Sequence, residues 1–281
     1  MNTRRLVISL IFVICHISFS VAQKTLTILH TNDTHSCVLP LNKNLADTVV
    51  AGRGGFIRRL AMIQQERQQD PDLLLFDSGD FSQGSSYYTM FKGDVEIGLM
   101  NMMHYDAGTI GNHEFDFGLE NMARLFKMAN FPIICSNYDF ANTELADIVK
   151  PYIILKRKGV KIGVFALAPP LNGLVSTQNY GPLKYLDAAP VAQQMADLLK
   201  YKKKCDLVVC ISHLGWKTSD VPDNSVISKT HGIDIVLGGH SHTYLQQLEY
   251  VNDCNGHPVG VDQNGKHGVF VGKLLLSMKK K

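Results

Sequence analysis

A chain of 281 residues is long enough for one large domain or two small ones, and a hydrophobic content of 45% is sufficient for a buried core. Charged residues make up 19% of the chain, and the formal net charge is only +3. Lys and Arg form no stripe inside the domain, so we expect no binding to a nucleic acid duplex through a basic face.

The N-terminus has the pattern of a secretory signal peptide over residues 1–22. Two arginines precede the apolar stretch LVISLIFVICHISF, and small residues follow it where a signal peptidase cuts. The apolar stretch is short for a membrane span and is interrupted by His16. This favours a cleaved signal over a retained anchor. We therefore expect a secreted or periplasmic protein whose residues 23–281 form the mature domain, with no membrane span after cleavage.

Strand and helix patterns alternate along the rest of the chain. In chain order, the patterns predict a strand at 25–30, a helix at 54–69, a strand at 72–76, a helix at 93–103, a strand at 107–110, a helix at 119–129, a strand at 132–136, a hairpin at 152–167, a helix at 189–204, strands at 206–212 and 233–239, and a strand-rich region at 244–278. Fully apolar runs such as DLLLF and DLVVC suit strands that are covered on both faces. The alternation predicts an α/β domain with a mixed sheet.

The six cysteines, five of them in the mature chain, have irregular spacings that predict no disulfide framework. Cys135, Cys205 and Cys210 lie in or beside apolar runs, so we expect them to pack in the core. No cysteine pair has the spacing of a structural zinc site.

Polar clusters directly follow five of the predicted strands. They are HTNDTHS (30–36), DSGD (77–80), GNHEFD (111–116), SHLG (212–215) and GGHSH (238–242). Because ligands bind at the carboxyl ends of strands in α/β folds, we expect these clusters to meet at one edge of the sheet. Together they offer Asp33, His35, Asp80, Asn112, His113, His213, His240 and His242. This mixture of carboxylate, amide and imidazole suits a pair of borderline divalent ions such as Zn²⁺ or Mn²⁺.

Each cluster alone has a plainer explanation, because Asp and Asn are common turn residues and a single His after a strand often packs. The coincidence of all five favours a site over independent turns. The other histidines lack this support. We expect His30 to pack or to orient Asp33, and we expect surface or turn positions for His104, His231, His257 and His267. Trp216 is expected to pack in the core.

Five motifs in this order resemble the N-terminal catalytic domain of the 5′-nucleotidase family, within the calcineurin-like metallophosphoesterases. They are ILHTNDTHS, LLFDSGDFSQGS, GNHEFDFG, ISHLG and VLGGHSH. The resemblance begins at about Leu26 and runs to the end of the chain. It implies a four-layer α/β/β/α sandwich with mixed sheets. It also implies a phosphoric ester hydrolase that uses two divalent metal ions, either Zn, Mn or Co.

The resemblance also implies roles for individual residues. One metal would be held by Asp33, His35, Asp80 and His242, and the second by Asp80, Asn112, His213 and His240. Asp80 would bridge the two ions and fix their separation. His113 would face the phosphate instead of a metal, with Asp116 orienting it, and Glu114 would be structural.

Two departures from the family pattern bear on the substrate. Cys37 stands where several relatives carry an Arg, so one phosphate contact is expected to be missing or supplied elsewhere. Family members often continue into a second domain that binds the nucleoside, and the sequence after Gly239 predicts no such domain. Both departures concern the nucleotide preference and leave the phosphoesterase core intact.

The sequence thus predicts a secreted hydrolase that releases phosphate from nucleoside 5′-monophosphates. A 2′,3′-cyclic nucleotide phosphodiesterase or a broad phosphatase is the alternative among enzymes. A binding module without catalysis is a second alternative, although the pair formed by His113 and Asp116 argues against it. A third is the catalytic half of a split enzyme, in which a separate chain binds the nucleoside.

Overall fold

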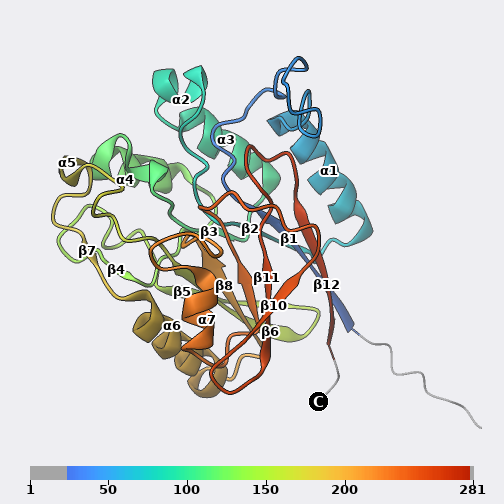
Figure 1. Cartoon of the computed structure of the whole chain (residues 1–281), viewed down its shortest axis with the longest axis vertical. Helices are drawn as coiled ribbons and strands as arrows, with labels where there is room; N and C mark the ends of the chain where they lie inside the picture. Colours follow the sequence, from blue (N-terminus) through green and yellow to red (C-terminus); the bar gives the residue numbers. More distant parts are fainter. Residues whose placement is uncertain (1–23, 279–281) are drawn as a thin grey trace, which may run out of the picture.

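The computed structural model describes residues 24–278, so the predicted signal peptide lies outside the described residues. Within them, two large β-sheets lie face to face, and helices cover their outer faces (Figure 1). A short two-stranded ribbon joins β4 (Tyr138–Asp139) to β7 (Lys184–Tyr185). Among the described residues, no helix is both long enough and apolar enough to cross a membrane.

The first sheet has four strands in the order β12-β1-β2-β3. Their bounds are Lys24–Thr31 for β1, Leu74–Asp77 for β2, Ala107–Gly108 for β3 and Gly272–Met278 for β12. β1, β2 and β3 run parallel, with Ile28 opposite Leu74, whereas β12 closes the edge antiparallel to β1. The carboxyl ends of the three parallel strands therefore point in the same direction.

The second sheet has six strands in the order β10-β11-β9-β8-β6-β5. Their bounds are Tyr152–Arg157 for β5, Val160–Leu167 for β6, Leu207–Ser212 for β8, Ile235–Leu237 for β9, Glu249–Asn252 for β10 and Pro258–Asp262 for β11. The four central strands are parallel, and the edge strands β5 and β10 are antiparallel to their neighbours.

Helices occupy the connections between strands. They are α1 (Phe56–Gln69), α2 (Ser86–Phe91), α3 (Asp94–Met103), α4 (Gly118–Met128), α5 (Thr177–Tyr180), α6 (Ala188–Asp197) and α7 (Asp223–Ser228). A 3₁₀ turn at His113–Phe115 precedes α4, and a π-helical turn at Leu198–Lys202 extends α6. The chain thus encloses most of its apolar strand residues between helices and sheets.

Three apolar layers hold the elements together. Side chains of both sheets, among them Phe76 and Val209, fill the space between the sheets. A second layer joins the first sheet to α1, α3 and α4, and a third joins the second sheet to α6 and α7. Three apolar layers separate four layers of secondary structure, so the predicted α/β/β/α sandwich with mixed sheets is confirmed.

Most predicted elements are present, and the hairpin turns at Lys158 and Gly159 as expected. The strand predicted at 132–136 is wrong, because this segment forms only isolated bridges. Its backbone N–H groups donate to three different partners in turn: Ile134 to Gly108, Cys135 to Lys150 and Ser136 to Ala166. The segment is apolar because it passes through the core between these partners, and it never pairs with one strand for its length.

The cysteine and tryptophan predictions are confirmed for the described residues. Cys135, Cys205 and Cys210 are buried, and none of the five described cysteines forms a disulfide. Trp216 is also buried, in the layer beneath α6 and α7.

Glu114 organises the loops at the carboxyl ends of the first sheet. Its buried carboxylate accepts hydrogen bonds from the backbone N–H groups of Asp80 (3.0 Å), Ser82 (3.1 Å) and Gly111 (2.6 Å). Burial, and then the charge of Asp80, raise the pKa of Glu114 to about 7. One side chain therefore ties the loop after β2 to the loop after β3, which agrees with a structural role.

Replacing Phe76 with Ala should destabilise the fold by about 3–5 kcal/mol, because Phe76 is fully buried between the two sheets and the truncation leaves a cavity. Urea unfolding of the purified variant measures this change. Ile57→Ala provides the control, since Ile57 is 80% exposed on α1 and should change the stability by less than about 0.5 kcal/mol. Equal effects at the two positions would contradict the layer assignment.

Replacing Glu114 with Gln should cost about 1–3 kcal/mol of stability, because an amide keeps one acceptor and turns its NH₂ group toward a backbone donor. Thermal unfolding of the variant beside Glu120→Gln isolates the effect, since Glu120 is exposed on α4. A Glu114→Gln protein as stable as the control would show that these three hydrogen bonds do not hold the loops.

Candidate active site

The five polar clusters meet as expected, but they come from two sheets, whereas the strand patterns alone predicted one sheet. Asp33, Asp80 and Asn112 follow β1, β2 and β3 of the first sheet, whereas His213 and His240 follow β8 and β9 of the second. Because the two sheets pack face to face, the ends of their parallel strands adjoin at one end of the sandwich. The expectation of one shared edge is thus corrected to an edge formed by both sheets.

One group of candidate ligands combines Asp33, His35 and His242. A donor atom from each lies within 4.8 Å of the others. His242 Nε2 is 3.3 Å from Asp33 Oδ1 and 3.0 Å from His35 Nε2. His35 Nε2 is also 3.9 Å from Asp80 Oδ2. A carboxylate and two imidazoles at these separations can hold one divalent ion, with Asp80 beside it.

A second group combines Asp80, His213 and His240, again within 4.8 Å. His213 Nδ1 donates to the Ser78 carbonyl at 2.6 Å, which leaves Nε2 as the free donor of an electron pair. That Nε2 lies 3.1 Å from Asp80 Oδ2 but makes no hydrogen bond there. His213 Nε2 and Asp80 Oδ2 are therefore close enough to bind one cation together.

Asn112 directly precedes His113, whose backbone N–H donates to Asp80 Oδ1, so Asn112 belongs to the loop beside Asp80. Asn112 Oδ1 is buried and has no hydrogen-bond partner, as is also true of His213 Nε2. A buried acceptor without a donor is unfavourable unless something else pairs with it. Unpaired oxygen and nitrogen acceptors around two carboxylates therefore fit divalent metal ions, and the residues present match the group that the sequence implied.

The charges of the site point the same way. Burial opposes ionisation of Asp80, but the neighbouring His213 and His35 hold the pKa of Asp80 well below its usual range. Burial opposes protonation of His213, yet the charge of Asp80 raises the pKa of His213 to about 10. Burial and the neighbouring His213 lower the pKa of His240 to about 4. The two carboxylates thus attract positive charge, which a metal ion can supply in place of a proton.

The backbone at this edge adopts an unusual conformation. Five candidate ligands have positive φ angles: Asp33 (48°), His35 (42°), Asp80 (54°), His240 (71°) and His242 (53°). Residues other than glycine rarely adopt this region, and clusters of them mark functional sites. The space is equally tight, because a Cβ on Gly111 would overlap Asp80 Oδ1. The loops after the strands therefore hold the candidate ligands close together in backbone conformations that are strained.

The geometry allows two roles for His113. Its Nδ1 lies 3.2 Å from Asp116 Oδ2, and its backbone N–H donates to Asp80 Oδ1 at 2.9 Å. Burial lowers the pKa of His113, but the Asp116 hydrogen bond and the charge of Asp80 outweigh it and raise that pKa overall. His113 also has a nitrogen within 4.8 Å of potential ligand atoms of His35 and Asp80, which is close enough for the three residues to bind one metal ion. It is therefore placed either to donate a proton or to bind a metal.

His267 is a site residue that the sequence reasoning missed. Its ring centroid lies 5.9 Å from that of His35, and its backbone N–H donates to the Asp33 carbonyl at 2.7 Å. It has a positive φ of 63°, and burial together with His35 lowers its pKa to about 4. His267 lies in a turn, as predicted, and His104 and His257 are exposed as expected, but the sequence did not indicate that the turn at His267 lies beside the site. No local motif marks His267, because the chain only returns to the site after β11.

His30 packs beneath the site without touching the Asp33 side chain. Its Nε2 lies 2.9 Å from Ser78 Oγ, and its Nδ1 lies 2.9 Å from Asn264 Nδ2. Of the two roles predicted for His30, the structure supports packing. Through Ser78, whose carbonyl receives His213, this buried imidazole supports the site from below.

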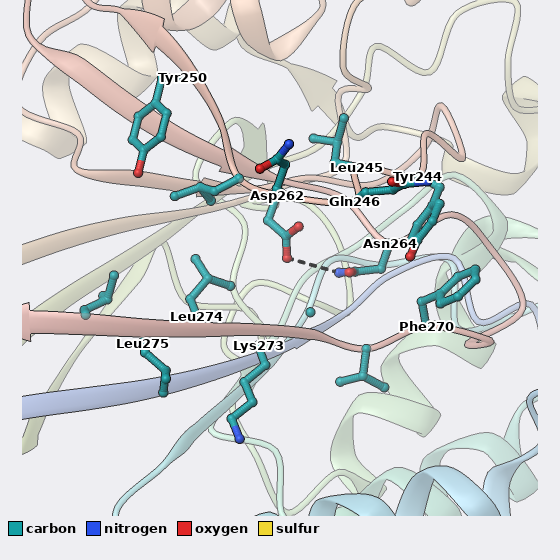
Figure 2. A pocket seen from close by; sticks show the side chains of 15 residues that line it. Tyr244, Leu245, Gln246, Tyr250, Asp262, Asn264, Phe270, Lys273, Leu274 and Leu275 are labelled. Atoms are coloured by element: carbon teal, nitrogen blue, oxygen red, sulfur yellow. Dashed lines mark hydrogen bonds between the residues drawn. The ribbon is translucent and has the colours of Figure 1, made fainter.

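Two cavities lie near this region. One of about 310 Å³ reaches the site at His240 and is also lined by Pro169, Asn172 and Leu174. Another, of about 380 Å³, lies between β12 and the segment leading into β10 and contains none of the candidate ligands (Figure 2). Figure 2 shows the Asp262 carboxylate directed toward Asn264. Of these two cavities, the one at His240 is lined by a candidate ligand.

Comparison with known proteins agrees with this geometry. The family model of the calcineurin-like phosphoesterases matches residues 26–244. The chain is 33% identical over 226 residues to human 5′-nucleotidase, covering 78% of this chain and 38% of that protein. It is 30% identical over 288 residues to the trifunctional nucleotide phosphoesterase protein YfkN of Bacillus subtilis (strain 168), covering 91% of this chain and 18% of that protein.

A solved structure shows the same arrangement. The 5′-nucleotidase precursor from Thermus thermophilus superposes with a TM-score of 0.82 at 30% identity, covering 91% of this chain and 52% of that chain. The chain thus spans about half or less of the length of these relatives. The family match covers most of its length, and all five polar clusters lie within the matched residues. This chain belongs to the calcineurin-like phosphoesterase family.

Proposed function

We propose that the protein is a metal-dependent phosphoric monoester hydrolase that releases phosphate from nucleoside 5′-monophosphates. The observation that carries this proposal is the position of Asp80 in two groups of potential ligand atoms, one with His35 and His113 and one with His213 and His240. A carboxylate shared in this way can bridge two ions. Two bound ions supply a nucleophile from water and neutralise charge on the phosphate.

The candidate ligands divide into two sets in this proposal. Asp33, His35, Asp80 and His242 hold one ion, and Asp80, Asn112, His213 and His240 hold the other. The Ser78 carbonyl fixes the ring of His213 by accepting from Nδ1, so that Nε2 remains a ligand. Zn²⁺, Mn²⁺ and Co²⁺ all suit this mixture of carboxylate, amide and imidazole.

His113 is the proposed proton donor. Asp116 holds Nδ1, which leaves Nε2 to carry the proton that the departing oxygen needs. The raised pKa of His113 keeps more of this group protonated near neutral pH. Asp116 thus acts through His113 as a positioning residue.

Nucleoside 5′-monophosphates are the first choice of substrate because two of the relatives bear the name 5′-nucleotidase. A second candidate is a wider set of nucleotide phosphoesters, including 2′,3′-cyclic nucleotides. It is supported by similarity over 91% of this chain to a trifunctional nucleotide phosphoesterase. The cavity at His240 offers about 310 Å³ for the group attached to the phosphate in either case.

Export from the cytoplasm is proposed on the signal-like pattern of residues 1–22. The exported protein should then begin at Gln23, which N-terminal sequencing of secreted material can check. A separate chain that binds the nucleoside is also a proposal, tested by whether this chain alone discriminates between nucleotides.

Turnover of AMP, 2′,3′-cyclic AMP and an aryl phosphate by the metal-loaded protein tests the proposal. We expect phosphate release from AMP, its loss on exhaustive chelation, and its return with Mn²⁺, Zn²⁺ or Co²⁺, because the carboxylates at the site need a cation. Cleavage of the cyclic ester would favour the wider activity. Unchanged AMP turnover after chelation would overturn the metal-dependent mechanism.

Replacing His113 with Ala should lower kcat by roughly 10²–10⁴ while leaving the metal content unchanged, since a proton donor contributes about this much to the rate. Kinetics and elemental analysis of the same preparation measure the two quantities. His257→Ala is the matched control, because His257 is exposed. Loss of metal from His113→Ala would assign His113 as a ligand. Asp116→Asn should have a smaller effect on kcat, because Asp116 acts only through His113.

A further inference from the structure

A basic cavity of about 260 Å³ lies at the N-terminal end of α1, apart from the candidate metal ligands. It is lined by Arg53, Arg58 and Arg59, by glycine backbone and by a few apolar side chains. No Asp or Glu lines it. Three arginines around one small cavity concentrate positive charge in a chain whose net charge is only +3.

Arg59 is the distinctive residue of this cavity. It is only 4% exposed, and its Nε and Nη1 atoms are buried without a hydrogen-bond partner. Its guanidinium lies 4.7 Å from the centre of the Phe56 ring, and a Cβ on Gly268 would overlap Nη1. The guanidinium is thus held in place by packing, while its Nε and Nη1 atoms donate to no acceptor.

An arginine in a protein is always charged, so burying one without an acceptor is unfavourable. Among residues 24–278, no carboxylate forms an ion pair or hydrogen bond with Arg59; this includes Asp77, whose pKa burial raises to about 6 despite the charge of Arg59. The first turn of α1 contains no acidic residue, and the N-cap Gly55 has no side chain to cap it. The positive end of the helix dipole therefore adds to the charge of the arginines.

We propose that this cavity binds a small oxyanion of the size and charge of phosphate. Arg59 is its buried contact, because planar guanidinium donors match the oxygens of such an anion. Arg53 and Arg58 are exposed and stand where the ion enters. Arg58 Nη1 already donates to the Gly52 carbonyl at 2.6 Å, so this side chain is positioned by the backbone beside the cavity.

The cavity adjoins the candidate active site through one loop. Gly268, which contacts Arg59, directly follows His267, and the ring of His267 lies beside that of His35. An anion on Arg59 would therefore brace the 265–268 loop against α1. Free phosphate and the phosphoryl group of a larger molecule share the required chemistry. Binding at this cavity does not depend on the proposed hydrolase activity.

Equilibrium dialysis of the metal-loaded protein against labelled inorganic phosphate tests the inference. Arg59→Met should bind one equivalent less phosphate per chain than the unaltered protein, because Met keeps the packing length but has no donors. Arg124→Met is the control, since Arg124 is an exposed arginine that pairs with Asp94, and it should bind as the unaltered protein does. Counting the difference separates this cavity from any phosphate bound at the metal site. Equal stoichiometry in Arg59→Met and the unaltered protein would overturn the proposal.

A second variant tests the same inference in case Arg59→Met does not fold. Replacing both Arg53 and Arg58 with Met changes only exposed side chains. It should weaken the affinity for the phosphate bound at the Arg59 cavity by about tenfold, because charge-assisted contacts are lost. Unchanged binding in this variant would contradict the assignment of these arginines to the site. Repeating the dialysis with a non-hydrolysable phosphonate analogue of AMP distinguishes the sources. Exclusion of the analogue from the Arg59 site identifies free phosphate, and its binding there identifies a phosphoryl group on a larger molecule.

Discussion

The candidate active site depends on hydrogen bonds that lock the carboxyl ends of two separate sheets together. Ser78, which follows β2 of the first sheet, donates from Oγ to the Leu237 carbonyl of the second sheet at 2.8 Å and accepts from His213 Nδ1 at 2.6 Å. Asp33 accepts from the His240 backbone N–H at 3.0 and 3.1 Å. Some of the candidate ligands follow strands of one sheet and the rest follow strands of the other, so these contacts hold the two parts of the candidate metal site together.

The same arrangement lowers the stability of the folded protein, because it contains strained backbone and buried charges. Candidate ligands such as Asp33 and His240 have left-handed backbones, and the carboxylates of Asp33 and Asp80 are buried among imidazoles. Such strain and buried charge persist where the surrounding structure enforces them. Ions bound there would return part of this free energy, because ligands that are held ready in the folded state couple metal affinity to folding. Stability and function are thus linked at this edge, and the apolar layers supply the remainder.

Local patterns in the sequence indicated the candidate ligands, whereas contacts between distant segments could not be predicted from the sequence. Asp80 and His213 were predictable because each directly follows an apolar strand. The two-sheet architecture came from the resemblance, since periodicity alone indicated only a mixed sheet. The segment 132–136 has the composition of a strand. It does not form one, because its backbone N–H groups donate to three different partners. His267 and Arg59 gain their significance from a loop that returns after β11, which no local motif announces.

The most direct measurement of the central claim is anomalous diffraction from crystals of the protein grown with Mn²⁺. We expect two peaks at the shared edge of the sheets, one beside Asp33, His35 and His242 and the other beside His213 and His240, with Asp80 contacting both. Two ions sharing a carboxylate should lie about 3.5–4 Å apart. A single peak, or two peaks of which only one contacts Asp80, would contradict a bridged two-metal centre.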